Sequence, residues 1–249
     1  MIIWLASYPK SGNTWIRLFL NTLLYSKETS VDINNINIQQ FPNKKHFGDL
    51  TNDIGNVSEF VKNCNLAQTK LNLDNKIKFF KTHNALWKSG SYSFTEHENT
   101  LGVIYIVRDP RNVITSIKNH YAKKNYDDAL EFMRHQKKFI GSQEIINEYE
   151  IPTLISSWST HYNSWKKLKK NYLLIKYENL LKNPFDEFSK ITDYLKKNTN
   201  LRFSKDLILK AIDECNFQKL RKQENQNGFK EAPTRDTKFF FLGPENNWR

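Results

Sequence analysis

The chain has 249 residues, within the range of one large α/β domain, and 14% of them are aromatic. Its formal net charge of +12 favours anionic partners but does not choose between nucleic acid, a membrane surface and phosphorylated or sulfated small molecules. Two cysteines, Cys64 and Cys215, are too few for a disulfide framework and lack the spacing of a metal site, as expected in a reducing compartment. With no signal-peptide pattern and no apolar run of about 18 residues, we expect a soluble, cytoplasmic protein without a membrane span.

The first predicted elements are a buried strand over residues 2–6 and a helix over 14–25. Between them lies "SYPKSGNTW" (7–15), in the strand–turn–helix setting of a phosphate-binding loop. Residues 27–75 are polar and rich in Asn, and predict short helices and loops over a site. Strands follow at 76–83 and at 101–109, and Asp109-Pro110 has the start signals of a helix that ends near Tyr121.

The second half of the chain predicts helices at 127–140, 156–170, 183–195 and 204–215, the last with Ser204 as its cap, and a strand at 172–177. Residues 221–249 show no clear period. Strands that alternate with helices indicate an α/β fold with a central parallel sheet flanked by helices, and no boundary divides residues 1–249, so we expect one domain. Ligands of such sheets bind beyond the carboxyl ends of the strands, here near residues 7–14, 81–83, 108 and 177.

The loop after the first strand is suited to an anion. Gly12 permits a close backbone approach, Ser11 and Thr14 add hydroxyl donors, and Lys10 adds a positive charge. In the loop of ATPases and GTPases a lysine stands at the position of Asn13, and no strand here ends in a clear Mg²⁺-binding Asp. The pattern therefore favours a phosphate held as an anchor, although a kinase with an altered loop stays open as an alternative.

Two further strand ends carry candidate functional residues. His83 in "KTH" has the setting of a general base, with Lys81 on the same strand face, although a lone histidine is more often a structural one. The other five histidines have no comparable setting. Arg108 and Ser116, in "VRDPRNVITS", suit a second phosphate, although an Arg–Asp pair fixing the turn explains Arg108 about as well.

Five motifs in order, "YPKSGNTW", "KTH", "VRDPRNVITS", "KYENL" and "FFFLGPENNW", resemble the cytosolic-type sulfotransferases, and the chain is similar to bacterial members of that family. These enzymes transfer a sulfuryl group from 3′-phosphoadenosine 5′-phosphosulfate (PAPS) to an acceptor and release adenosine 3′,5′-bisphosphate. The resemblance extends from residue 3 to residue 249. It implies a P-loop-like fold and a PAPS-dependent transferase that needs no metal.

The resemblance also implies roles for individual residues. His83 is the catalytic base, Lys81 assists the sulfuryl group, and Lys10 lies at the bridging oxygen. The implied contacts to the nucleotide come from Lys10, Ser11, Gly12, Asn13, Thr14, Trp15, Arg108, Ser116, Tyr177, Phe217 and Gly243.

The chain departs from the family pattern near its end. Many members carry Arg-Lys-Gly there, whereas this chain has Phe241-Leu242-Gly243, so two cations of the 3′-phosphate site are missing. Nearby cations that could replace them are Arg221, Lys222, Lys230 and Arg235. The acceptor is a small molecule or a glycan, and the sequence leaves its identity open. A basic, aromatic-rich nucleic-acid binder is the non-enzymatic alternative, but no basic stripe supports it.

Overall fold

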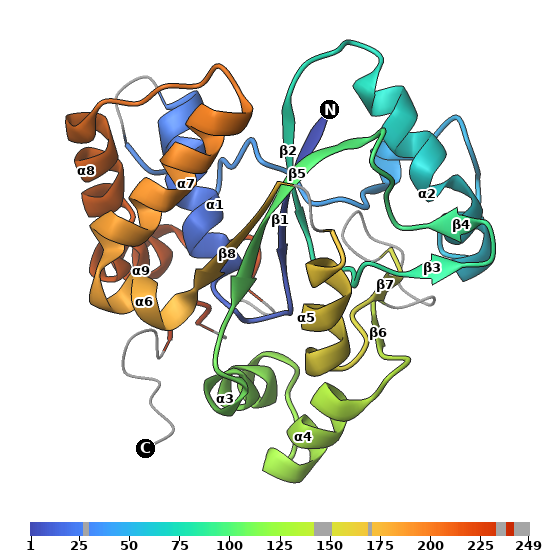
Figure 1. The fold of residues 1–249 in the computed structure, drawn as a ribbon. Helices are drawn as coiled ribbons and strands as arrows, with labels where there is room; N and C mark the ends of the chain where they lie inside the picture. The colour runs from blue at the N-terminus through green and yellow to red at the C-terminus, as the bar shows by residue number, and fades with distance from the viewer. Residues whose placement is uncertain (27–29, 142–150, 169–170, 233–237, 242–249) are drawn as a thin grey trace. The chain divides into compact units, whose positions relative to one another are not determined.

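The computed structural model describes residues 1–26, 30–141, 151–168, 171–232 and 238–241. Its main sheet has four strands, β1 (Ile2–Ser7), β2 (Lys78–Thr82), β5 (Thr100–Val107) and β8 (Tyr172–Lys176), in the order β2-β1-β5-β8. β1 is parallel to both of its neighbours. The predicted parallel sheet is therefore confirmed, and it brings the ends of β1, β2 and β5 to one edge (Figure 1).

The described chain forms two compact units. The first contains residues 1–9, 39–106 and 131–174, and the second contains residues 10–38, 107–130 and 175–249. Each unit combines segments that are far apart in sequence, and β5 and β8 both run from the first unit into the second. The expectation of one domain over residues 1–249 stays a prediction.

Aromatic packing around β1 forms the core of the first unit. Every residue of β1 is buried, and Trp4 lies among Phe41, Phe80 and Phe94 with ring centroids 5.2–6.2 Å apart. The indole N–H of Trp4 donates to Thr100 Oγ1 at 2.9 Å, which satisfies its polar atom inside the core. The unit also contains η1 (Lys44–His46), α2 (Val57–Asn72), α5 (Trp158–Lys166) and the small antiparallel pairs β3 (Lys88–Ser89) with β4 (Tyr92–Ser93) and β6 (Phe139–Ile140) with β7 (Thr153–Leu154).

Helix α2 differs from the short helices expected between residues 27 and 75. It has 16 residues, and Asn56 caps it by accepting from the Ser58 backbone N–H at 2.9 Å. It buries Phe60, Cys64 and Ala67, which recur at helical spacing. This apolar stripe is narrow, so the helical period is hard to recognise in a sequence stretch rich in polar residues.

The second unit is mainly helical. Its helices are α1 (Asn13–Tyr25), α3 (Pro110–His120), α6 (Tyr177–Lys182), α7 (Pro184–Asn198), α8 (Lys205–Glu214) and α9 (Phe217–Asn227), and α4 (Tyr126–Arg134) begins in it. α8 packs against α1 and α7. The predicted caps are confirmed, because Asp109 accepts from the Arg111 backbone N–H and Ser204 from that of Leu207.

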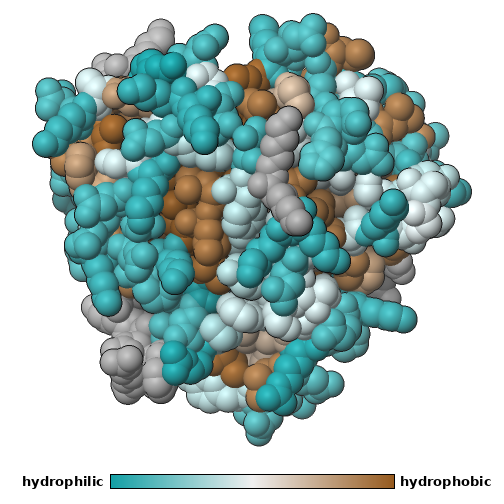
Figure 2. Space-filling view, viewed as in Figure 1, coloured by the Kyte–Doolittle hydropathy of each residue, from teal (hydrophilic) through white to brown (hydrophobic). Residues whose placement is uncertain are grey.

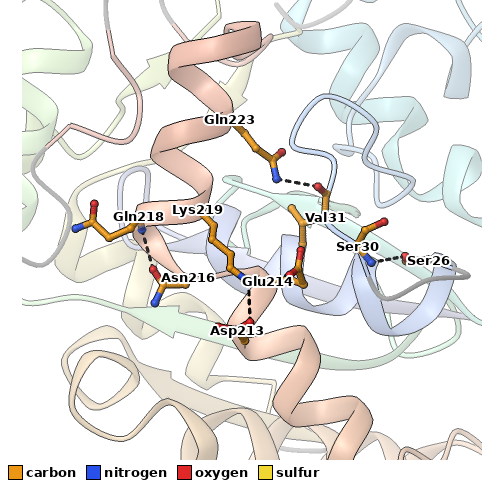
Figure 3. Close-up of polar contacts among 9 residues, drawn as sticks. All are labelled: Ser26, Ser30, Val31, Asp213, Glu214, Asn216, Gln218, Lys219 and Gln223. Atoms are coloured by element: carbon orange, nitrogen blue, oxygen red, sulfur yellow. Dashed lines mark hydrogen bonds and ion pairs between the residues drawn. The ribbon is translucent and has the colours of Figure 1, made fainter.

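The start of α9 was not predicted. Asn216 caps it by accepting from the Gln218 backbone N–H, and Lys219 pairs with Asp213 and Glu214 at the end of α8 (Figure 3). Farther along, Gln223 donates to the Val31 carbonyl oxygen at 2.9 Å. Only Leu220 and Glu224 are buried in this helix, so it lacks the apolar stripe that would have revealed it.

On the face shown in Figure 2, hydrophobic residues form separate patches among hydrophilic ones. Among the described residues, no helix combines the length and apolar character needed to cross a membrane.

Candidate functional site

The loop that follows β1 opens the second unit with an unusual backbone. Lys10 and Gly12 have φ values of 65° and 97°, and Gly12 precedes α1 without any side-chain cap. A backbone that alternates in this way turns its N–H groups toward a common point and suits an anion. The loop closes tightly on Tyr177, the first residue of α6, since a Cβ on Gly12 would lie 2.4 Å from the Tyr177 ring.

Arg108 follows β5 and is fixed against the same loop. Its Nη1 donates to the Lys10 carbonyl oxygen at 3.2 Å, and its guanidinium carbon lies 4.2 Å from the centroid of the Tyr177 ring. Burial lowers the pKa of Arg108, while Tyr177 and Glu178 act in the opposite direction. Burial likewise raises the pKa of the Tyr177 phenol. Asp109, the next residue, pairs with Arg111.

The Lys10 side chain is held by two aromatic residues. Its Nζ lies 3.9 Å from the centroid of the Phe239 ring and 3.4 Å from Nδ1 of His120, the last residue of α3. An ammonium group over an aromatic face is stabilised by roughly 0.5–2 kcal/mol. His120 was not a sequence candidate, although it lies four residues after Ser116 on α3 and therefore on the same helix face.

Several polar atoms of the second unit are buried without a hydrogen-bond partner among the described residues. Among them are three donors of predicted nucleotide contacts, Ser11 Oγ, Trp15 Nε1 and Arg108 Nε. Buried donors are normally satisfied, and an unsatisfied one costs about 1–3 kcal/mol. Three predicted contacts to an anionic nucleotide thus retain unused hydrogen-bonding capacity, which fits a phosphate-bearing ligand.

The remaining nucleotide candidates lie on helices of the same unit. Thr14 and Asn13 are in the first turn of α1 and are buried, and Ser116 is in the second turn of α3. Trp15 makes edge contacts with the Tyr177 and Phe188 rings at 6.0 and 5.7 Å. Phe217 begins α9 and contacts Phe240 at 6.4 Å.

The late motif is anchored by an acid. Glu224 of α9 is 2% exposed and accepts the backbone N–H groups of Phe239 and Phe240 at 2.6 and 2.9 Å. Of the proposed substitute cations, Arg221, Lys222 and Lys230 are described, and Lys230 Nζ donates to the Asn34 carbonyl oxygen. Leu242, Gly243 and Arg235 lie outside the described residues.

In the first unit, His83 directly follows β2 and bonds to the end of β1. Its Nδ1 lies 2.8 Å from the Ser7 carbonyl oxygen. Because a carbonyl oxygen only accepts, Nδ1 carries the proton and the basic lone pair belongs to Nε2. Lys81, near the end of β2, is 8% exposed, and its backbone N–H and C=O pair with Gln39 and Phe41.

His161 of α5 is one of the five histidines that do not lie at the end of a predicted strand. It is fully buried, its Nε2 lies 3.1 Å from the His83 carbonyl oxygen, and its Nδ1 lies 2.8 Å from the Tyr105 hydroxyl. Burial lowers its pKa to about 3, so the ring is neutral near pH 7. No local pattern connects a helix residue 78 positions away to His83, so only the fold reveals this contact.

A protein-family comparison decides the family. The model described as "Sulfotransferase domain" matches residues 2–249. The chain belongs to the sulfotransferase family. By that membership it is a sulfotransferase, and the kinase alternative has no support.

Curated relatives carry the same family name. The chain is 25% identical to sulfotransferase 2A6 of Mus musculus over 51% of this chain and 45% of the relative. It is 25% identical to sulfotransferase 2A1 of Homo sapiens over 89% of this chain and 67% of the relative. It is 23% identical to cytosolic sulfotransferase 13 of Arabidopsis thaliana over 98% of this chain and 70% of the relative.

Solved structures share the fold of this sulfotransferase. One is mouse sulfotransferase SULT7A1 complexed with PAP, with a TM-score of 0.58, 20% identity, and coverage of 99% of this chain and 76% of that chain. Another is retinol dehydratase in complex with androsterone and the inactive cofactor PAP, with a TM-score of 0.58, 17% identity, and coverage of 96% and 74%. The expected P-loop-like α/β fold is confirmed.

Metal binding has no counterpart among the residues that the structure describes. No group of three or more His, Cys, Asp or Glu side chains there is placed to hold a metal ion. A reaction without metal stays a prediction.

Proposed function

We propose that this sulfotransferase transfers the sulfuryl group of PAPS to a hydroxyl or amine of a small-molecule or glycan acceptor, with His83 as the general base. The observation that carries the proposal is the hydrogen bond of His83 Nδ1 to the Ser7 carbonyl oxygen, because it assigns the basic lone pair to Nε2. A base within reach of the acceptor proton contributes about 10²–10⁴-fold to the rate. When bound, PAPS supplies the electrophilic sulfuryl group.

The nucleotide is held by residues of the second unit. Ser11 Oγ, Trp15 Nε1 and Arg108 Nε are donors without a partner in the part of the chain that the structure describes, and the N-terminal end of α1 favours negative charge. We assign the 5′ side to Lys10, Ser11, Gly12, Asn13 and Thr14, the 3′-phosphate to Arg108, Ser116 and Gly243, and the adenine side to Trp15, Tyr177 and Phe217. Lys10 stabilises the charge that develops on the leaving phosphate, and Lys81 assists at the sulfuryl group.

The acceptor class is the open part of the proposal. Retinol dehydratase, which shares the fold, was solved with androsterone, a small molecule with a hydroxyl group. We therefore place a small-molecule acceptor first and a glycan second. A cytoplasmic location is a further part of the proposal.

The proposal is tested by transfer of labelled sulfate from PAPS to a panel of acceptors, namely a phenol, a primary alcohol, an aliphatic amine and a hexose. We expect His83→Ala and Lys10→Ala to lose nearly all turnover, with folding checked by circular dichroism. His97→Ala and Lys88→Ala are the matched controls, because both residues are exposed and lie outside the candidate site. Full turnover in His83→Ala would refute the base assignment.

Nucleotide preference gives a second, independent test. We expect adenosine 3′,5′-bisphosphate to raise the melting temperature in the presence of a metal chelator, and Arg108→Gln to weaken this effect. Stabilisation by ATP with Mg²⁺ alone would contradict the proposed donor.

A further inference from the structure

Four hydrogen bonds join the candidate base to distant parts of the first unit. They link the peptide group between Ser7 and Tyr8, the Tyr105 hydroxyl, the His161 ring and His83. β1 supplies the peptide group, β5 supplies Tyr105, α5 supplies His161, and His83 follows β2.

In each of these bonds only one of the two groups can be the donor. The Tyr8 N–H donates to the Tyr105 hydroxyl, because an amide nitrogen cannot accept. The His161 Nε2 must donate to the His83 carbonyl oxygen, and the His83 Nδ1 must donate to the Ser7 carbonyl oxygen. The remaining bond then has the Tyr105 O–H donating to the lone pair on His161 Nδ1 at 2.8 Å.

Together with the covalent bonds of His83 between its carbonyl group and its ring, the bonds form a closed cycle. The Ser7 carbonyl oxygen and the Tyr8 N–H belong to the same peptide unit, so the chain of donors returns to the group where it began. The three bonds that lead from the Tyr8 N–H to the His83 carbonyl oxygen run in one direction and polarise one another, but this effect does not pass through the saturated Cα and Cβ of His83 to its ring. The carbonyl acceptors fix one tautomer on each histidine, Nε2–H on His161 and Nδ1–H on His83.

We propose that Tyr105 and His161 are positioning residues for the base: they hold the His83 backbone and thereby fix where its ring lies. The proposal rests on the proposed role of His83. His161 acts on the carbonyl oxygen of His83 while the Ser7 carbonyl oxygen acts on its ring, so the residue is held at both ends.

The surroundings of His161 agree with a fixed, neutral ring. The side chain is fully buried, and the edge of its ring meets the Tyr8 ring at a centroid distance of 5.7 Å and an angle of 89°. Burial holds its pKa near 3, far below working pH, so both nitrogens keep the pattern of one donor and one acceptor that the cycle requires.

Tyr105→Phe is the first test, because it removes one oxygen and opens the cycle with little change in volume. The matched control is Tyr172→Phe. The Tyr172 ring stacks on Tyr105 at 6.2 Å, and its buried hydroxyl has no partner among the described residues. With the best acceptor of the panel above, we expect Tyr105→Phe to lower kcat by roughly tenfold or more with little change in KM, since part of the base contribution is lost. Tyr172→Phe should keep the kcat of the unaltered chain.

A pair of substitutions at His161 separates positioning from packing. Glutamine in His161→Gln keeps an N–H that can reach the His83 carbonyl oxygen, whereas leucine in His161→Leu fills similar space without a donor. We expect His161→Gln to retain clearly more kcat than His161→Leu. Equal losses in the two variants would indicate packing alone and would overturn the proposal.

Nitrogen-15 NMR of histidine-labelled protein tests the cycle without any turnover. We expect the Nε2–H tautomer for His161 and the Nδ1–H tautomer for His83, and in Tyr105→Phe a changed Nδ1 chemical shift at His161, because that lone pair loses its donor. The opposite tautomer on either ring would overturn the proposal, as would equal kcat values for Tyr105→Phe and Tyr172→Phe. Full turnover in His83→Ala is a different outcome, because it removes the proposed function and the positioning role together.

Discussion

Replacing Gly12 by alanine should destabilise the second unit more than an ordinary glycine substitution does. Gly12 has φ 97°, and an added Cβ would lie 2.4 Å from Cδ2 and 2.9 Å from Cε2 of Tyr177. The Tyr177 ring has little room to retreat, since it is 8% exposed and contacts the Arg108 guanidinium and the edge of Trp15.

The expected magnitude has two parts. A left-handed backbone costs an alanine about 1–2 kcal/mol. Forcing a methyl group into a packed position costs about 1–3 kcal/mol more. We therefore expect Gly12→Ala to lower the free energy of unfolding by about 2–5 kcal/mol.

Urea denaturation measures this loss, and two comparisons separate its parts. Gly90→Ala is the control for the backbone alone, because Gly90 has φ 60° and no atom within 4 Å of an added Cβ. In the double variant Gly12→Ala/Tyr177→Ala the added methyl group no longer meets the Tyr177 ring. The loss of unfolding free energy in the double variant should therefore be smaller than the sum of the two single losses by about 1–3 kcal/mol. If Gly12→Ala costs no more than Gly90→Ala and the coupling is negligible, Tyr177 does not close on the loop as described.

Three further predictions concern buried ionisable groups. Burial lowers the pKa of His161 from 6.5 to about 3 and that of His46 to about 4. Below about pH 6.5 these histidines are therefore protonated in the unfolded chain while they are still neutral in the folded chain. Stability should fall as the pH drops, by about 2 kcal/mol for each histidine at about pH 5, and urea denaturation of His161→Gln should show a weaker loss. Glu224→Gln leaves a buried amide where a carboxylate accepted two backbone N–H groups, so hydrogen exchange at Phe239 and Phe240 should accelerate by roughly tenfold or more while the core of the first unit is unchanged. Glu231→Ala strands the buried Arg17, its salt-bridge partner, and should lower the melting temperature more than Arg17→Met does; the reverse order would contradict this.

Much of the fold could be predicted from local signals. The strands near residues 2, 101 and 172 are apolar runs, and Asp109-Pro110 and Ser204 mark helix starts through their own side chains. These features depend on neighbours within a few positions, which the sequence contains directly. The boundaries of α1, α3, α7 and α8 are therefore within about three residues of their predicted positions.

The helices that were missed bury too few apolar residues for a periodic pattern to stand out. α2 lies in an Asn-rich stretch, and α9 buries a single apolar residue, Leu220, and an acid, Glu224. Glu224 is buried because two backbone N–H groups from the late motif satisfy it. These two N–H groups belong to residues 15 and 16 positions away, which is farther than the few turns over which a helical pattern in the sequence is recognised.

The same limit applies to the candidate site. Residues at strand ends, such as His83 and Arg108, could be selected because a parallel sheet places those ends at one edge. Tyr105 and His161 could not, because an apolar strand ordinarily contains a tyrosine and a helix ordinarily contains a histidine. Their significance comes from the hydrogen bonds that link Tyr105 to His161 and His161 to the His83 carbonyl oxygen, and only the folded chain brings these three residues together.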